Sequence, residues 1–593
     1  MSQNIYKYPL DEVREIRDLR DMLEQSEKLY GDKAAYMIKD PIAARQIAPR
    51  SEEALNLKID HKRPYKTVSY KQYAQDVRAL GTALKNRGVN EKSRVAILAE
   101  TRYEWYVTYM AVVNGLAVVV PLDKEQPPNE IVNLVNSAEV DVLFFSQSKK
   151  EAVDSIRGEI PSVQHYVGFD VPEEGESDVY FWDLLAEGEK QREAGDLSYD
   201  TLPIDPQAMQ ILLFTSGTTS TPKAVMLSHK NICKNLMGMC QMVYIGPDDV
   251  FLSVLPLHHT YECTCGYLCP LYRGCTVAVC EGLRYIVPNM QEAKPTMVLV
   301  VPLMMEAFHR GIMKKVKSDA KLEKKFMFGM KLTRGLRKVG IDLRRKIFDS
   351  VHENFGGNLR MLIAGGAAIA PELLKDMQDL GFNCLQGYGL TECAPILALN
   401  RTHYYNNRSA GLALPGVDIK ILDPDENGIG EIAGRGDNVM LGYYKNEKAT
   451  KDVIDEDGFF HTGDYGYLDK DQFVIITGRK ANIIVTKNGK NVFPEEIEFL
   501  LTQHPLIAEA VVSGQARKDG DTLIHAEIYP DRDTVDEDPE LKGLPLTDAR
   551  VKEKVNAVVK EVNQGLVHYK TVRTISLRDT EFPKTTAKKI IRH

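Results

Sequence analysis

Short apolar runs that alternate with helical patterns constrain the fold of this chain more than any other feature of its sequence. Strand-like runs cover residues 94–100, 118–122 and 140–146, and a helical pattern over residues 104–115 stops at Gly115. Neighbouring parallel strands need a crossover connection of this kind, which is usually a helix. The alternation therefore predicts an α/β fold whose sheets are mainly parallel.

The N-terminal segment and the segment after residue 478 have patterns of their own. Apolar residues from Val13 to Leu23 recur at helical spacing and predict a helix that ends near Gly31. A change of pattern near residues 478–485 predicts a domain boundary there, which divides the chain into residues 1–478 and 479–593.

The C-terminal domain is predicted to combine strands and helices. Strand-like runs lie at residues 510–513 and 525–529, and a helix carries four valines between Val551 and Val562 on one face. The acidic, proline-bearing stretch at residues 531–546 is predicted to be an exposed loop.

Composition and charge exclude several classes of protein. The chain has 75 Lys and Arg against 83 Asp and Glu, a net charge of −8, whereas nucleic-acid binders usually carry a basic excess. The first 21 residues lack the apolar core of a signal peptide, and no apolar run reaches the length of about 18 residues that a spanning helix needs. These features predict a cytoplasmic protein that does not bind nucleic acid.

The nine cysteines are predicted to be buried thiols. Seven of them lie between Cys233 and Cys280, including a C-x-C-x3-C group at Cys263, Cys265 and Cys269. That spacing is not a zinc pattern, and free cysteines behave as small apolar residues.

A basic helical stretch spans residues 314–346. Apolar residues such as Phe326, Met327 and Leu332 are interleaved with its lysines and arginines. One interpretation is peripheral contact with an anionic membrane, at the inner face of the cytoplasmic membrane. The other is a solvated helical pair, because Asp319 and Glu323 dilute the charge.

A loop rich in hydroxyl groups follows a predicted strand at residues 211–214. It reads TSGTTSTPK from Thr215 to Lys223, and a second strand and a helix capped by Ser228 are predicted to follow it. Hydroxyls, exposed amides and a lysine at such a tip can bind phosphate oxygens. The loop is not a Walker A motif, and a solvated surface loop is the alternative.

Several motifs, taken in order along the chain, resemble those of one enzyme family. They are TSGTTSTPKAVMLSH (215–229), QGYGLTECAP (386–395), GYYKN (442–446), HTGDYGYLD (461–469), GRKANIIVTKNGKNVFPEEIE (478–498) and FPKTTAKKIIR (582–592). The chain resembles the AMP-forming adenylating enzymes, or ANL superfamily. The motifs RYEW (102–105) and PLHHTYE (256–262), with the basic insertion, are most similar to the long-chain fatty acyl-CoA synthetases.

The resemblance implies a fold and an activity. It implies a large N-terminal domain of layered sheets and helices with a small distorted β-barrel part, and a small mobile α+β C-terminal domain. The implied reaction uses ATP and Mg²⁺ to convert a medium- or long-chain fatty acid to acyl-AMP, releases pyrophosphate, and transfers the acyl group to CoA.

The resemblance also assigns roles to residues of this chain. Glu392 and Thr215 are expected to bind Mg²⁺, Lys589 and His259 to assist catalysis, and Ala481 to lie at the hinge. Gly489 and Lys490 are expected to face CoA. The residues expected to bind ATP or AMP are Thr215, Ser216, Gly217, Thr218, Thr219, Lys223, Gly366, Ala367, Ala368, Gln386, Gly387, Tyr388, Gly389, Thr391, Asp464 and Arg479.

The chain departs from the family pattern at four positions. Ser220, Ala224 and Lys588 stand where the family commonly has Gly, and Ala481 stands where it more often has Lys or Asp. Two alternatives to the CoA ligase remain, and the departures motivate only the second of them. One is an acyl-AMP ligase that loads an acyl carrier protein, and the other is a weakly active relative that binds nucleotide or acyl groups.

Overall fold

The computed structural model describes the chain in two compact units. The first consists of Met1–Asp418 and Arg435–Gly458, and the second of Ile419–Gly434 and Phe459–His593. The division at residue 478, which the change of sequence pattern predicts, stays a prediction. The described residues are 5–57, 60–171, 178–215, 222–486, 490–516, 522–584 and 590–592.

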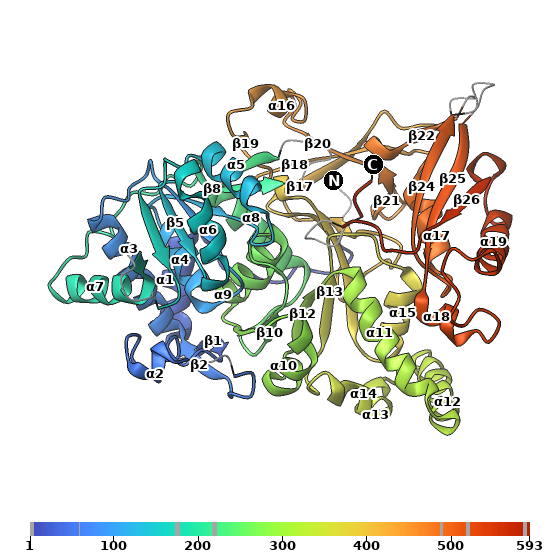
Figure 1. Cartoon of the computed structure of the whole chain (residues 1–593), viewed down its shortest axis with the longest axis horizontal. Coiled ribbons are helices and arrows are strands. Elements are labelled where there is room, and N and C mark those ends of the chain that lie inside the picture. The colour runs from blue at the N-terminus through green and yellow to red at the C-terminus, as the bar shows by residue number, and fades with distance from the viewer. Residues whose placement is uncertain are drawn as a thin grey trace. The chain divides into compact units, whose positions relative to one another are not determined.

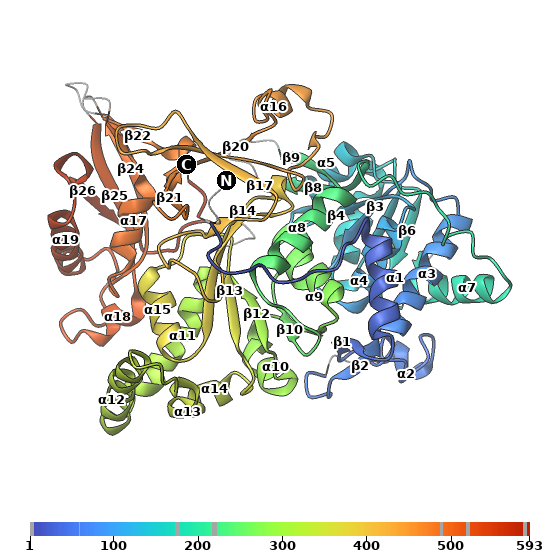
Figure 2. The ribbon, with the colours of Figure 1, turned by 180° about the vertical axis from the view of Figure 1, so that it is seen from behind.

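One large sheet of unit 1 contains the three strands that the sequence predicts (Figures 1 and 2). It is parallel from β8 to β7, while β9 runs antiparallel to β8 and β19 antiparallel to β9. Among the described residues its strands are, in order, β19 (Gly442–Tyr443), β9 (Lys223–Ser228), β8 (Met209–Thr215), β4 (Val118–Pro121), β3 (Arg94–Leu98), β5 (Val142–Phe145), β6 (His165–Gly168) and β7 (Val179–Tyr180).

Burial explains why these runs form central strands. Every residue of β4 and β5 is buried, and so is every residue of the helix α4 (Tyr103–Val113) that connects β3 to β4. A strand covered on both faces reads as a continuous apolar run rather than an alternating one. The predicted helix and its stop at Gly115, which has a φ of 86°, are confirmed.

The second large sheet of unit 1 is parallel from β14 to β1. The strand β2 pairs antiparallel with β1, and β15 and β16 extend the other edge antiparallel. In the described chain its order is β16 (Leu412–Ala413), β15 (Ile396–Leu399), β14 (Asn383–Gly389), β13 (Met361–Ala364), β12 (Met297–Val300), β10 (Val250–Ser253), β11 (Thr276–Val279), β1 (Ala34–Ile38) and β2 (Lys66–Ser69).

The N-terminal helix begins later than predicted. α1 covers Leu19–Tyr30, and the side chain of Asp18 accepts a hydrogen bond from the amide of Asp21 at its start. A capping carboxylate at this position satisfies a free amide of the first turn, so the apolar residues before it remain outside the helix. The predicted end near Gly31 is correct.

The described residues of unit 2 form three smaller sheets. The strands β17 (Val417–Leu422), β18 (Gly430–Gly436), β20 (Phe460–Leu468) and β21 (Val474–Arg479) form one of them. The others are the hairpin of β22 (Ile484–Val485) and β23 (Asn491–Val492), and the sheet of β24 (Ile507–Ala516), β25 (Thr522–Pro530) and β26 (Thr574–Leu577).

The predicted C-terminal elements are confirmed, but the predicted exposed loop at 531–546 is not. The two predicted strands are β24 and β25, and the valine-bearing helix is α19 (Ala549–Gln564). Residues 531–546 instead form the helix α18 (Arg532–Glu537) and a turn, and Val535, Leu541 and Leu546 pack into the core. Three apolar anchors outweigh the acidic composition of the stretch.

Two further predictions concern the cysteines and the basic stretch. All nine cysteines are free and buried, as expected of small apolar residues. The basic stretch is helical, with α11 (Pro302–Lys317), α12 (Ala320–Arg337) and α13 (Arg344–Ile347). Among the described helices, none has both the length and the apolar character that crossing a membrane requires.

Candidate functional site

The strands β8 and β9, which flank the hydroxyl-rich segment in the sequence, pair as a β-hairpin. Thr215 ends β8, Lys223 begins β9, and the two residues face each other as the last pair of the ladder. The Thr215 hydroxyl lies 3.4 Å from the Lys223 carbonyl oxygen. The predicted phosphate-binding residues between them, Ser216, Gly217, Thr218 and Thr219, lie outside the described residues.

A tyrosine connects this hairpin with the predicted metal ligand. The Tyr443 hydroxyl donates a hydrogen bond of 2.9 Å to Glu392 Oε1, and Lys223 Nζ lies 4.9 Å from the centre of the Tyr443 ring. Burial, and next the Glu392 carboxylate, raise the pKa of the Tyr443 hydroxyl, which keeps it a donor. The structure thus brings Lys223 and Glu392 into contact with the same side chain.

Two buried asparagines hold the short turn that carries Thr391 and Glu392. The side-chain amides of Asn235 and Asn438 each donate to the carbonyl oxygens of Cys393 and Ile396, at 2.8–3.1 Å. The backbone adds a bond of 2.8 Å from the Met440 amide to the Glu392 carbonyl oxygen. Because buried carbonyl groups need hydrogen-bond partners, these bonds fix the backbone position of Glu392.

The residues predicted to line a nucleotide lie in or just after the last part of two adjacent parallel strands. β13 and β14 pair with Ala364 opposite Gln386, so the segments after both strands emerge at the same sheet edge. Sites in open α/β sheets form at the carboxyl ends of parallel strands. Gly366, Ala367 and Ala368 are exposed there, Gln386, Gly387 and Tyr388 are half-buried, and Gly389 is exposed.

Two of these glycines have steric reasons to lack a side chain. Gly366 has a φ of 84°, which favours glycine. A Cβ at Gly389 would lie 1.9 Å from the carbonyl oxygen of Pro395, which no backbone adjustment of a few tenths of an ångström relieves.

The predicted catalytic histidine follows a third strand of the same edge. His258 and His259 lie in the loop after β10, with ring centroids 4.1 Å apart. His258 Nε2 lies 3.6 Å from Asp123 Oδ1, yet burial, and next His259, lower the pKa of His258 to about 3. His258 is therefore neutral at physiological pH.

A buried acid braces that loop. Glu262 is 1% exposed and lies in the π-helix η3 (Tyr261–Leu268), which follows the two histidines. Its Oε1 accepts a hydrogen bond of 2.5 Å from Ser253, the last residue of β10, and Ser253 in turn accepts one from Tyr106. Burial raises the pKa of Glu262 to about 8. The bond between Ser253 and Glu262 joins the two ends of the loop that carries His259.

The predicted ribose-binding residues form an ion pair in unit 2. Asp464 on β20 and Arg479 on β21 are opposite each other in the ladder, and Arg479 Nε lies 3.1 Å from Asp464 Oδ1. Asp464 is 4% exposed, whereas the Arg479 side chain is 47% exposed. The aspartate is thus fixed, and the arginine reaches solvent.

Two other predicted positions in unit 2 lie on described segments. Ala481 is exposed in the short turn Lys480–Asn482 after β21, and Lys490 Nζ pairs with Glu426 Oε1 at 2.6 Å. Gly489, Lys588 and Lys589 lie outside the described residues.

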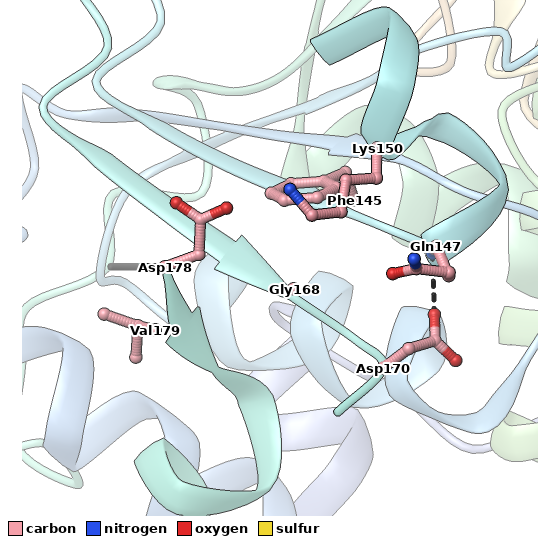
Figure 3. Close-up of a pocket in the computed structure, with 7 residues that line it drawn as sticks. All are labelled: Phe145, Gln147, Lys150, Gly168, Asp170, Asp178 and Val179. Atoms are coloured by element: carbon pink, nitrogen blue, oxygen red, sulfur yellow. Dashed lines mark hydrogen bonds between the residues drawn. The ribbon is translucent and has the colours of Figure 1, made fainter. Parts of the chain in front are cut away.

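A small pocket elsewhere in unit 1 is not this site (Figure 3). It lies at the ends of β5 and β6, and of the predicted site residues in the described chain none lines it. Its charges are already paired, because Asp170 binds Arg102, Asp178 binds Arg157 and Lys150 binds Asp154.

The oxygen atoms at the candidate site suit a hard cation that enters the site already bound to a substrate of the enzyme. Glu392 supplies carboxylate oxygens and Thr215 a hydroxyl, the ligand type that Mg²⁺ prefers. Within the described segments, no group of three or more His, Cys, Asp or Glu could hold a metal ion by itself. A magnesium ion here would take its other ligands from phosphate and water.

Comparisons with known proteins agree with this architecture. The family model described as AMP-binding enzyme matches residues 45–444, and that of the AMP-binding enzyme C-terminal domain matches residues 481–593. A long-chain-fatty-acid–CoA ligase, FadD15, of Mycobacterium bovis is 27% identical over 88% of both chains. Long-chain-fatty-acid–CoA ligase 6 of Mus musculus is 28% identical over 81% of this chain and 72% of its own.

Solved structures share the fold at lower identity. The o-succinylbenzoate CoA synthetase MenE of Bacillus subtilis, bound to its acyl-adenylate, has a TM-score of 0.70 at 21% identity and covers 96% of both chains. The anthranilate CoA ligase AuaEII, bound to anthranoyl-AMP, has a TM-score of 0.73 at 19% identity and covers 99% of this chain and 97% of its own.

Sequence reasoning did not single out Tyr443 or Glu262, although both lie in quoted motifs. The signal for Tyr443 was its place in GYYKN, but its partner Glu392 lies 51 residues away. Nothing in the local pattern around Glu262 indicates that a charged residue there is buried.

Glu262 generates a prediction about pH and stability. Its pKa is about 8 in the folded chain against an ordinary value of 4.5, so folding takes up a proton between these values and stability falls as pH rises. Glu262→Gln mimics the protonated form and lacks this titration. The melting temperature of the variant, relative to the natural chain, is expected to rise between about pH 5 and pH 7.5.

The control is Glu91→Gln, which changes an exposed carboxylate in a turn. Thermal melts of the three proteins across this pH range test whether Glu262 titrates with a raised pKa. If the Glu262 variant differs from the natural chain by the same amount at every pH, the carboxyl group does not titrate as the geometry implies.

Proposed function

The chain belongs to the AMP-binding enzyme family, and we propose that it converts a medium- or long-chain fatty acid to an acyl-CoA. The carboxylate attacks the α-phosphorus of ATP and pyrophosphate leaves, which gives acyl-AMP. The sulfur of CoA then attacks the acyl carbon, the thiol proton passes to solvent, and AMP leaves. The single observation that carries this proposal is the approach of Lys223 and Glu392 to Tyr443 beside the hydroxyl-rich hairpin.

The acid class rests on the sequence relatives. Several of them are long-chain fatty acid ligases, over most of the chain, whereas the solved structures include ligases for o-succinylbenzoate and anthranilate. The interleaved basic and apolar insertion at residues 314–346 also favours a lipid substrate, because it offers contact with the phase in which fatty acids reside.

The unit 1 residues are proposed to bind the nucleotide from two sheets. Hydroxyls and amides of residues 215–219, with Lys223, bind the β- and γ-phosphates, since preorganised donors suit charge that is already present. Glu392 and Thr215 hold Mg²⁺, which neutralises phosphate charge when bound. The adenosine wall consists of Gly366, Ala367, Ala368, Gln386, Gly387, Tyr388, Gly389 and Thr391, and the Tyr388 ring is proposed to stack on adenine.

The unit 2 residues are proposed to act in sequence. Asp464 accepts hydrogen bonds from the ribose hydroxyls and Arg479 donates to the ribose. Lys589 brings a positive charge between the fatty acid carboxylate and the α-phosphate, and His259 of unit 1 contacts the same region. After adenylation, rotation about a hinge at Ala481 replaces Lys589 with Gly489 and Lys490, which face CoA.

A second candidate acceptor is an acyl carrier protein. Acyl-AMP forms in the same way for both acceptors, so the nucleotide residues do not distinguish them. The CoA sulfur is favoured because the sequence relatives that cover most of the chain are CoA ligases.

The proposed activity predicts a substrate profile. With Mg-ATP, pyrophosphate release is expected to rise from short to long saturated fatty acids, and acyl-CoA is expected to form when CoA is added. Pyrophosphate and thioester are measured in separate assays across the acid series. Thioester on a carrier protein but not on CoA would establish the second acceptor, and no pyrophosphate with any acid would establish a binding protein.

The role of Lys589 predicts unequal effects on the two half-reactions. Lys589→Ala is expected to slow acyl-AMP formation by at least about 100-fold, since a charge directed at the transition state is lost. Thioester formation from supplied acyl-AMP is expected to change by less than about threefold, because Lys589 has left by then. Lys588→Ala is the matched control. Equal losses in both half-reactions, or a larger loss in the Lys588 variant, would refute the assignment.

The Tyr443 hydrogen bond predicts a change in magnesium dependence. Tyr443→Phe keeps the ring beside Lys223 but leaves Glu392 without its donor, so the Mg²⁺ concentration for half-maximal adenylation is expected to rise about tenfold. Glu392→Gln is expected to raise it further, because a carboxylate ligand is lost. Tyr444→Phe is the control, since that hydroxyl bonds Arg94 and Glu139 instead. Unchanged magnesium dependence in both variants would exclude Glu392 as a ligand.

A further inference from the structure

The helix α12 has basic and apolar side chains on its solvent face rather than polar ones alone. Its buried face consists of Phe326, Gly329, Met330 and Thr333. The opposite stripe follows the three- and four-residue spacing of a helix face. That stripe consists of Lys321, Lys324, Lys325, Phe328, Lys331 and Leu332, all of them exposed.

The exposed apolar side chains gather in this part of unit 1. Phe328 is 67% exposed, and in the loop after α12 Val339 is 71% exposed and Ile341 47%. Seven of the 20 exposed large hydrophobic residues in the described chain lie between Leu322 and Leu343. Single exposed apolar residues are ordinary, but a cluster marks an interaction surface.

The net charge of this segment is opposite in sign to that of the whole chain. Residues 314–346 contain 13 Lys and Arg against 3 Asp and Glu, a net charge of +10 in a chain of net charge −8. Arg334 and Arg337 are paired with Asp379, whereas in the described part of the chain Lys321, Lys324 and Lys331 have no ion-pair partner. The lysines of the stripe are therefore available to an anionic partner.

α12 is placed where a flat surface can reach it. It packs on α11 and α15 (Pro371–Asp379) of the same unit, and α11 separates it from β12 and β13 in both views of the ribbon (Figure 2). α12 therefore lies at the periphery of unit 1.

We propose that Lys321, Lys324, Lys325, Phe328, Lys331, Leu332, Val339 and Ile341 form a docking surface for an anionic lipid bilayer. The lysine ammonium groups bind lipid phosphates, while Phe328, Leu332 and Val339 enter the headgroup region. A basic helix with apolar residues in its polar face binds membrane interfaces in this way. A purely electrostatic contact with an acidic protein or nucleic acid has no use for the exposed Phe328 and Val339.

The test measures co-sedimentation of the full-length chain with vesicles. Binding to phosphatidylcholine vesicles that contain about one third phosphatidylglycerol is expected, with at least about tenfold weaker binding to pure phosphatidylcholine. Raising the salt concentration from about 0.05 to 0.5 M is expected to weaken the anionic binding by a similar factor.

Two variants separate charge from apolar insertion. The triple variant Lys324→Glu, Lys325→Glu and Lys331→Glu is expected to abolish anionic binding, and Phe328→Ser with Leu332→Ser, which keeps every charge, is expected to weaken it at least about tenfold. The matched controls change exposed residues elsewhere and are expected to bind normally. They are the triple variant Lys62→Glu, Lys92→Glu and Lys190→Glu, and the double variant Leu29→Ser and Leu283→Ser.

Insertion has its own readout. The two natural tryptophans, Trp105 and Trp182, are fully buried, so Phe328→Trp adds a solvent-exposed reporter. Its fluorescence is expected to shift to the blue with anionic vesicles and to stay unchanged with neutral ones. Failure to bind anionic vesicles, equal binding by both α12 variants and their controls, or binding without the shift would overturn the proposal. None of these outcomes affects the adenylation assays.

Discussion

The hydrogen bond from the Tyr443 hydroxyl to the Glu392 carboxylate connects the two sheets on which the candidate site depends. Tyr443 belongs to the strand β19, which pairs with β9 of the hydroxyl-rich hairpin, and Glu392 follows β14 of the other sheet. The donor is buried and the acceptor half-buried, and such groups lose more when separated than they gain when paired. The bond therefore sets the position of the hairpin base relative to Glu392, and Lys223 above the ring completes the arrangement.

The parallel sheet supplies the second constraint. Strands β10, β13 and β14 all end at one edge, so three loops from distant parts of the sequence lie side by side. Irregular loops hold a site only when something fixes them. Here Asn235 and Asn438 hold the turn at Glu392, and Glu262 holds the histidine loop. Burying Glu262 costs stability at neutral pH, a cost that is typical of residues that position a site.

Sequence patterns predicted what depends on local chemistry. The buried strands, the capping of α8 (His229–Met242) by Ser228 and the stop at Gly115 follow from residues within one element, and the structure confirms them. The start of α1 and the packing of residues 531–546 were wrong, because Asp18 and three buried apolar residues outweigh the general pattern. In both cases a specific contact decides, and composition alone does not reveal it.

The candidate site shows the same limit more clearly. Motif order predicts Thr215, Lys223, Glu392 and Asp464 as site residues. The sequence did not show that Tyr443 contacts both Lys223 and Glu392. Nor did it show that Ala224, at a position where the family commonly has Gly, sits in a regular strand pair opposite Phe214. Contacts between residues far apart in sequence depend on the order of the strands in the sheets. The spacing of neighbouring residues does not predict that order.

A crystal structure with a non-hydrolysable ATP analogue and Mg²⁺ tests the central claim most directly. The triphosphate is expected to lie against residues 215–223, with the metal bound to Glu392 and the adenine beside Tyr388. A triphosphate bound away from both the hairpin and Glu392 would contradict the arrangement proposed here.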